Sequence, residues 1–274
     1  MIRKASGQLE PFTIEKVKKS LAKSGASKEL VEEIATKIAE HPNIESTKDI
    51  HNFAVNYLQQ INPAIAARYN VRHALLELGP SGFPFEKFIA AIFSQQGYDT
   101  LHDQIVRGKC IEHEIDVIAH NNSDRYFVEC KFHHQHGLKV EVKVTLYCKA
   151  RFDDIQSVKS HDHRADTMWV ITNAKFTSEA IRYADCVGIK LLGWSYPADK
   201  NLQFYIDHFK MHPITALVSL SHKQKRSLIS EGLVLCRDAR THKEAFRKLG
   251  MSQAAIDPLI HEAELVCDLP RDTR

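Results

Sequence analysis

Three residues near the middle of the chain have side chains and spacing suited to holding a divalent cation. Asp116 lies in one apolar run, and Glu129 and Lys131 lie two residues apart in the next. Side chains alternate between the faces of a strand, so Glu129 and Lys131 share a face and Cys130 points to the other. A pairing register that sets Asp116 beside Glu129 would bring together two carboxylates, which repel each other unless a cation lies between them. Mg²⁺ prefers such oxygen ligands, so the spacing predicts a cation site beside a lysine.

These residues must be positioned by a β-hairpin over residues 112–131. The stretch Asn-Asn-Ser-Asp at 121–124 is typical of a turn, and the segment after it is rich in aromatic and β-branched residues. The alternative interpretation is a solvated hairpin face that carries charges of both signs.

The arrangement Asp…Glu-x-Lys resembles the active site of the PD-(D/E)XK nuclease superfamily, and its flanking residues are most similar to the Mrr-type restriction endonucleases. The matching runs are Ile115-Asp116-Val117-Ile118 and Val128-Glu129-Cys130-Lys131. The resemblance implies a Mg²⁺- or Mn²⁺-dependent endodeoxyribonuclease in which Asp116 and Glu129 hold the metal and Lys131 assists. It also implies products with a 5′-phosphate and a 3′-hydroxyl.

Glu86 opens an amphipathic helix over residues 85–93. In many PD-(D/E)XK nucleases a glutamate on this first helix joins the metal cluster, so the resemblance makes Glu86 a further catalytic and metal-binding candidate. The alternative is a first-turn acid that is favourable at the positive end of a helix.

Downstream of the hairpin the pattern predicts a helix over about 140–159, a buried strand at 168–173, a helix after Thr177 and a strand at 188–194. The last three form a βαβ unit with a parallel strand pair. This segment also resembles the region that follows Glu-x-Lys in Mrr-like enzymes. The predicted helix and the residue just before it form our candidate DNA-facing element, and the alternative is an ordinary solvated face. The basic side chains of this element are Lys139, Lys143, Lys149 and Arg151.

A polar stretch of three histidines follows the hairpin at residues 133–136. Imidazole is a common metal ligand, but the spacing fits no standard zinc motif. A DNA-backbone contact or an exposed loop is the favoured interpretation.

The first 79 residues predict a short β-hairpin followed by four helices. The same segment carries five motif runs in this order: Ile2-Arg3-Lys4…Gly7, Glu10-Pro11-Phe12, Glu15-Lys16-Val17, Thr47-Lys48-Asp49-Ile50-His51 and Ala66-Ala67-Arg68-Tyr69. These runs resemble the ATP-cone, the regulatory nucleotide-binding module of ribonucleotide reductases and their transcriptional repressor. The family has Lys-Arg before its glycine turn, whereas this chain has Lys4-Ala5 with Arg3 one step earlier. The resemblance implies that ATP or dATP is bound as an allosteric effector and not hydrolysed. The implied nucleotide contacts are Arg3, Lys4, Gly7, Glu10, Lys16, Thr47 and His51. The alternative is that these residues form a helix cap and a solvated basic face.

The overall composition limits which classes of protein these motifs can belong to. The chain has 274 residues, 43% hydrophobic and 26% charged, with a net charge of +3, so any basic surface must be local. Its six cysteines are scattered, which indicates reduced thiols and a cytoplasmic location. No apolar run approaches the roughly 20 residues that a membrane helix needs.

We therefore expect an α/β protein, α+β overall, with an ATP-cone at 1–79, a restriction-endonuclease-like mixed sheet flanked by helices at 80–197 and a small helical region at 198–274. The basic cluster near Lys225 makes this last region either a DNA contact or a packing subdomain. The expected partners are DNA, adenine nucleotides and further copies of the chain in a homo-oligomer. Two alternatives remain: a nucleotide-sensing DNA-binding regulator that does not cleave, and a repair or recombination nuclease for branched or damaged DNA.

Overall fold

The structure is a computed structural model that describes residues 2–3, 9–42, 44–79, 82–158 and 164–268. Its chain divides into two compact units. The central unit comprises residues 79–209. The terminal unit combines residues 1–78 with residues 210–274, so the two ends of the chain fold into one body.

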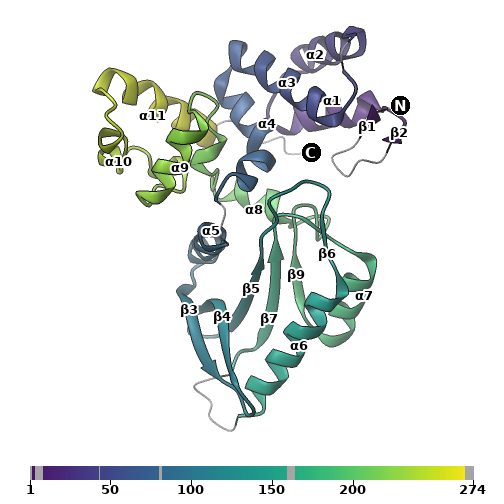
Figure 1. The fold of residues 1–274 in the computed structure, drawn as a ribbon, viewed down its shortest axis with the longest axis vertical. Coiled ribbons are helices and arrows are strands. Elements are labelled where there is room, and N and C mark those ends of the chain that lie inside the picture. Colours follow the sequence, from purple (N-terminus) through teal and green to yellow (C-terminus); the bar gives the residue numbers. More distant parts are fainter. Residues whose placement is uncertain (1, 4–8, 43, 80–81, 159–163, 269–274) are drawn as a thin grey trace. The chain divides into compact units, whose positions relative to one another are not determined.

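The central unit contains a sheet with helices on both faces (Figure 1). Its elements in chain order are α5 (Phe83–Gln95), β3 (Asp99–Arg107), β4 (Glu112–His120), β5 (Arg125–Lys131), β6 (Lys139–Val140), α6 (Val142–Gln156), β7 (Thr167–Thr172), β8 (Lys175–Phe176), α7 (Ser178–Val187), β9 (Lys190–Leu192) and α8 (Leu202–His208).

The sheet has the strand order β3-β4-β5-β7-β9. Strands β3, β4 and β5 are antiparallel neighbours, whereas β7 pairs parallel to β5 and β9 parallel to β7. A mixed α/β fold with a central mixed sheet flanked by helices is therefore confirmed. The predicted hairpin and the βαβ unit are both present, and the short strands β6 and β8 form a separate parallel pair.

Local chemistry explains where these elements begin and end. The Asn121 side chain accepts from the backbone N–H groups of Ser123 and Asp124 and so closes the β4–β5 turn. Thr177 caps α7 by accepting from the Ala180 N–H, and Gly188 ends that helix with a left-handed φ of 76°.

The two faces of the sheet bury different residues. On one face, Phe127 of β5 and Val170 of β7 belong to a core that includes residues of α6 and α7. On the other face, side chains of β5, β7 and β9 meet the apolar stripe of α5. Figure 1 shows α6 and α7 along one face of the sheet. Because alternate residues of β5 point to opposite faces, this strand separates two environments.

The terminal unit is mainly helical. Its elements are β1 (Ile2–Arg3), β2 (Leu9–Glu10), α1 (Ile14–Lys23), α2 (Lys28–Glu40), α3 (Thr47–Ile61), α4 (Pro63–Leu76), the 3-10 turn η2 (Ile214–Ala216), α9 (His222–Ser230), the 3-10 turn η3 (Cys236–Asp238), α10 (Lys243–Lys248) and α11 (Gln253–Asp268). The short hairpin followed by four helices agrees with the pattern expected for the first 79 residues.

Hydrogen bonds tie the two sequence segments of the terminal unit together. The Thr215 hydroxyl donates to the Ala74 carbonyl oxygen at 2.7 Å, and Lys225 forms a 3.0 Å ion pair with Glu77. Sequence analysis assigned these segments to separate domains, and it placed residues 198–209 with the C-terminal region, whereas they lie in the central unit. Lys225 is buried in this pair, so it does not belong to an exposed basic cluster.

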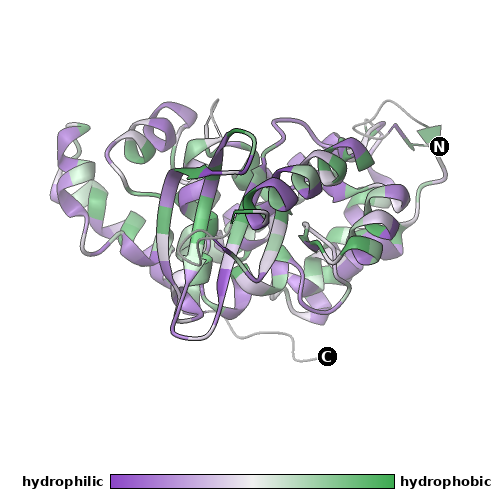
Figure 2. Ribbon diagram, turned by 90° about the horizontal axis from the view of Figure 1, so that it is seen from below, coloured by the Kyte–Doolittle hydropathy of each residue, from purple (hydrophilic) through white to green (hydrophobic). Residues whose placement is uncertain are grey.

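Figure 2 shows hydrophobic and hydrophilic residues alternating around the helices, as expected for elements packed on one side. None of the helices that the structure describes is long and apolar enough to cross a membrane.

Candidate active site

The β4–β5 hairpin brings the predicted acids together. These strands pair with Val117 opposite Val128, and the same register extended by one residue sets Asp116 opposite Glu129. Residues opposite each other in an antiparallel pair share a face of the sheet. Lys131 lies two residues beyond Glu129 on β5, so these two side chains belong to the face covered by α6. The charge of Glu129 acts on Asp116 from this face.

Glu129 is the most enclosed of the four predicted catalytic residues, with 4% of its surface exposed. Its Oε1 lies 2.8 Å from Lys131 Nζ and accepts a hydrogen bond from the Tyr147 hydroxyl. Its Oε2 forms a 2.6 Å ion pair with Arg151 Nη1. Burial alone would raise the pKa of Glu129, but the hydrogen bonds from Lys131 and Tyr147 and the charge of Arg151 outweigh it and lower the pKa. Glu129 is therefore a buried carboxylate held ionised by three donors.

Asp116 and Glu86 are in a different electrostatic state. Burial and the nearby charge of Glu129 raise the pKa of Asp116 to about 6, although the Cys130 N–H donates to its Oδ2 at 2.6 Å. Burial, followed by the charge of Asp116, raises the pKa of Glu86 to about 7. These shifts indicate crowded negative charge at the N-terminus of α5 and the hairpin.

Two further acids that sequence analysis did not single out contribute to this negative field. Asp103 and Glu114 both raise the pKa of Glu86. On β3, Asp103 lies between the residues paired with Val117 and Ile115, and thus opposite Asp116. Its φ of +50° is uncommon for a residue other than glycine, and aspartate is among the residue types that tolerate it best. The only sequence signal for this position is an acid in the strand that precedes the hairpin.

The ligands available for a metal are carboxylate oxygens. Within the described part of the chain, no group of three or more His, Cys, Asp or Glu side chains is arranged to hold a metal ion, and this includes residues 133–136. Mg²⁺ needs only one or two protein carboxylates when waters and a substrate phosphate complete its shell. Asp116 and Glu86 carry oxygens of this type, whereas Glu129 is engaged by Lys131 and Arg151.

The basic residues of the candidate DNA-facing segment have different partners. Arg151 points to Glu129, and on α6 Lys149 pairs with Asp153 while Lys143 pairs with Glu141. Sequence reasoning counted Arg151 as a surface charge and missed Tyr147. Their spacing of four residues places them on one helix face, which is the signal that could have identified them as partners of one side chain.

The candidate nucleotide contacts lie in the first part of the terminal unit. Arg3 is on β1, where its N–H donates to the Glu45 carbonyl oxygen at 3.0 Å, just before α3. Thr47 and Lys16 are exposed on α3 and α1. Glu10 is in β2. Lys4 and Gly7 lie outside the described residues.

Among the described candidate nucleotide contacts, His51 has several aromatic and hydrogen-bonding partners. Its ring stacks on Tyr69 at 5.3 Å and on His73 at 3.8 Å, and its Nε2 lies 3.0 Å from Asn70 Oδ1. Burial lowers the pKa of His51. The histidine is therefore a neutral aromatic group packed against α4.

Comparisons with known proteins identify two segments. The family model described as Restriction endonuclease, of the Mrr catalytic type, matches residues 79–194, and the model described as AF1548-like, C-terminal matches residues 212–267. Neither of these two models covers residues 1–78.

A curated relative and a solved structure agree with these segments. An uncharacterized protein from Archaeoglobus fulgidus is 37% identical over 179 residues, which is 65% of this chain and 99% of the relative. The crystal structure of AF1548, a protein of unknown function, superposes with a TM-score of 0.56 and 34% identity over 68% of this chain and 98% of that one. The chain therefore belongs to the family of AF1548, with a PD-(D/E)XK-like restriction endonuclease domain of the Mrr type at residues 79–194 and an AF1548-like C-terminal domain at residues 212–267.

Proposed function

We propose that the protein is a metal-dependent endodeoxyribonuclease that hydrolyses phosphodiester bonds at Asp116, Glu129 and Lys131. The observation that carries the proposal is the hairpin register, which sets the two acids opposite each other with the lysine on the same face. The restriction endonuclease domain implies DNA as the substrate.

The acids suit a hard divalent cation such as Mg²⁺ or Mn²⁺. Asp116 and Glu86 would hold the ion. Glu129 would become a third ligand if Lys131, Arg151 or Tyr147 released one of its carboxylate oxygens. A bound cation would relieve the repulsion that raises the pKa values of Asp116 and Glu86. When bound, it supplies an acidified water and charge neutralisation at the scissile phosphate.

Lys131 acts beside this metal site. Burial opposes its charge, but the hydrogen bond and the charge of Glu129 raise the pKa of Lys131, so it remains an ammonium group. An ammonium group in this position orients the attacking water or stabilises negative charge that develops on the phosphate. Arg151 and Tyr147 hold Glu129 in place from α6.

The test is cleavage of supercoiled plasmid with and without Mg²⁺, using the full chain and the variants Lys131→Ala and Lys190→Ala. Lys190 is an exposed lysine on β9 and serves as the matched control. Loss of one positioned donor typically lowers a rate by about 100-fold or more, so Lys131→Ala should be nearly inactive. Lys190→Ala should cut like the unaltered protein. Equal cleavage by all three proteins would refute the assignment.

The choice of DNA distinguishes restriction from the two alternative functions. Methylated plasmid and synthetic four-way junctions are tested beside the plain plasmid. Preference for junctions would favour a repair or recombination nuclease. Binding to all three DNAs without Lys131-dependent cleavage would favour a non-cleaving regulator.

We also propose that residues 1–79 form an ATP-cone through which ATP or dATP regulates cleavage or the assembly of a homo-oligomer. The order of the elements, β1-β2 followed by α1 to α4, supports this, as does the pairing of Arg3 with the segment just before α3. The aromatic stack of His51, Tyr69 and His73 offers flat rings near that segment.

Sedimentation and plasmid cleavage with ATP, dATP or neither test the regulatory part. Regulation requires that the nucleotide bind two states of the protein with different affinity. We expect a shift in either measurement that His51→Ala removes and the exposed control His261→Ala keeps. Nucleotide binding that changes neither measurement would disprove regulation and leave the nuclease proposal intact.

A further inference from the structure

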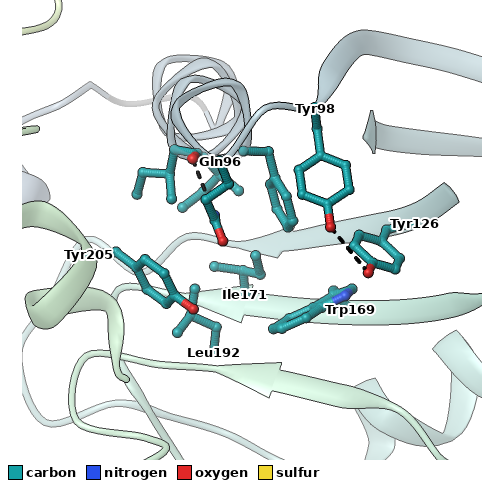
Figure 3. Close-up of a pocket in the computed structure, with 10 residues that line it drawn as sticks. Gln96, Tyr98, Tyr126, Trp169, Ile171, Leu192 and Tyr205 are labelled. Carbon is teal, nitrogen blue, oxygen red and sulfur yellow. Dashed lines mark hydrogen bonds between the residues drawn. The ribbon is translucent and has the colours of Figure 1, made fainter. Parts of the chain in front are cut away.

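A cavity of about 190 Å³ lies between α5 and the sheet, on the face opposite Glu129 and Lys131. It is lined by ten residues, half of which carry an aromatic ring. The aromatic residues are Phe93, Tyr98, Tyr126, Trp169 and Tyr205. Figure 3 shows Gln96 and Tyr205 reaching toward the space above Ile171 and Leu192.

The rings are held in place by one another. Phe93 packs edge-on against Trp169 at 6.1 Å and against Tyr98 at 5.9 Å. The Tyr98 hydroxyl donates to the Tyr126 hydroxyl at 3.3 Å, and these two rings lie 5.2 Å apart. Such contacts between rings stabilise the fold beyond the effect of the buried area alone. The aromatic lining of the cavity is therefore formed in the absence of a ligand.

The lining carries no ionisable group except tyrosine hydroxyls, so it suits a neutral ligand. Two polar groups are available to that ligand. Gln96 Nε2 donates to the Ile92 carbonyl oxygen at 3.2 Å, which leaves its Oε1 as an acceptor. The Tyr205 hydroxyl can donate or accept, and Figure 3 draws it beside the same space.

Size and chemistry together define the ligand. An apolar cavity of about 150 Å³ accepts a benzene ring, so this cavity has room for a heteroaromatic ring. Stacking on aromatic side chains is the usual way in which proteins hold unpaired bases. We propose that this cavity binds a nucleobase, with a base N–H donated to Gln96 Oε1 and the Tyr205 hydroxyl paired to a ring nitrogen or carbonyl.

The base does not belong to the nucleotide being cut. Tyr126 and Glu129 are three residues apart on β5 and therefore point to opposite faces of the sheet. The base comes either from a free nucleoside or from an unpaired position elsewhere on a nucleic-acid strand. Only the second source rests on the proposed nuclease function.

The fluorescence of Trp169, which lines the cavity, can report ligand binding. The protein has two tryptophans, so Trp194→Phe leaves Trp169 as the sole indole fluorophore. The full chain with this change is titrated with thymidine, deoxycytidine and deoxyadenosine, with a short single-stranded oligonucleotide, and with deoxyribose 5-phosphate, which lacks a base. Equilibrium dialysis measures the same binding independently of fluorescence.

We expect saturable binding of nucleosides or of the oligonucleotide, and none of deoxyribose 5-phosphate. Gln96→Met removes the acceptor and keeps the length of the side chain, and Tyr205→Phe removes only the hydroxyl. Each should weaken binding by about tenfold, which is the usual effect of one lost hydrogen bond. Gln95→Met is the matched control, because Gln95 is the neighbouring, exposed glutamine outside the lining.

Three outcomes would overturn the inference: no binding of any base in dialysis, unchanged affinity in Gln96→Met, or binding of benzene without binding of nucleosides or the oligonucleotide. Binding of the oligonucleotide alone identifies the strand as the source of the base. The Lys131→Ala protein separates this inference from the proposed function. It should bind nucleosides as the unaltered protein does. If the unaltered protein binds nucleosides but cuts no DNA, only the proposed nuclease function is refuted.

Discussion

The two faces of the central sheet bury different kinds of side chain, although the same strands supply both. One face buries a charged group, and the other buries uncharged aromatic rings. On the α6 face, Glu129 is a buried charge that depends on Lys131, Arg151 and Tyr147. On the α5 face, Tyr126 and Trp169 lie among uncharged side chains held by ring packing. A buried charge left without a partner costs far more than a lost contact between rings. We therefore expect loss of one partner on the α6 face to destabilise the protein strongly, and a single change on the α5 face to be tolerated.

Removing Arg151 should produce the largest loss of stability. Arg151→Met leaves the buried Glu129 with one cationic partner fewer, and breaking a buried pair costs about 3 kcal/mol. Urea unfolding measures the change. The exposed pair of Arg182 and Glu179 provides the matched control, and Arg182→Met should cost less than about 1 kcal/mol. Equal losses in the two variants would show that Glu129 does not depend on α6.

The acidic cluster on the same face should make stability depend on pH. The pKa values of Asp116 and Glu86 are raised to about 6 and about 7, from ordinary values of 3.8 and 4.5. Between the ordinary and the raised values the folded protein keeps protons that the unfolded chain has released. The contribution of these groups to stability therefore falls as pH rises from about 4 to 7.

Urea unfolding of metal-free protein at pH 5, 6, 7 and 8 measures this dependence. Asp116→Asn should flatten the fall between pH 5 and 7, because asparagine does not titrate. Asp185→Asn, at an exposed position of α7, should leave the fall unchanged. If the curve for Asp116→Asn matches that of the unaltered protein, the raised pKa of Asp116 is wrong.

A smaller effect is expected for the neutral partner of Glu129. Tyr147→Phe removes one hydrogen bond to a carboxylate, which costs about 1.5 kcal/mol. The pKa of Glu129 should also rise, because the Tyr147 hydroxyl is one of the donors that lower it. Chemical denaturation gives the first quantity, and NMR titration of the side-chain carboxyl gives the second. Tyr183→Phe on α7 is the control. An equal loss of unfolding free energy in that variant would show that the hydrogen bond from Tyr147 to Glu129 makes no particular contribution to stability.

The smallest effect should come from the α5 face. Tyr98→Phe removes the hydrogen bond to Tyr126 and should cost about 0.5 kcal/mol, since the ring and its packing remain. A loss as large as that of Arg151→Met would contradict the contrast between the two faces.

Much of the central unit followed from local sequence. The hairpin around the turn at 121–124, the helix that Thr177 caps and the parallel pair after it were all predicted, because turn chemistry, capping and apolar periodicity are local signals. The side-chain alternation of β5 also placed Glu129 and Lys131 on one face correctly. The roles of these residues in metal binding and catalysis stay predictions.

Contacts between distant segments could not be predicted in this way. Sequence analysis treated Arg151 as a surface charge because a helix does not reveal which strand residue lies beneath it. It likewise separated residues 1–79 from the C-terminal region, although Thr215 bonds to Ala74 and Lys225 pairs with Glu77. Such contacts depend on how whole elements pack, and propensity and spacing do not encode this.

Local sequence was enough to predict the β4 and β5 strands, the turn between them and the face on which each β5 side chain lies, because these features depend on neighbours within a few residues. Three other features depend on tertiary packing: α6 supplies Tyr147 and Arg151 to Glu129, Asp103 lies opposite Asp116, and five aromatic rings line one cavity. The physical reason is that a buried charge or cavity is defined by groups converging from several elements, and their convergence is fixed by packing of the whole domain.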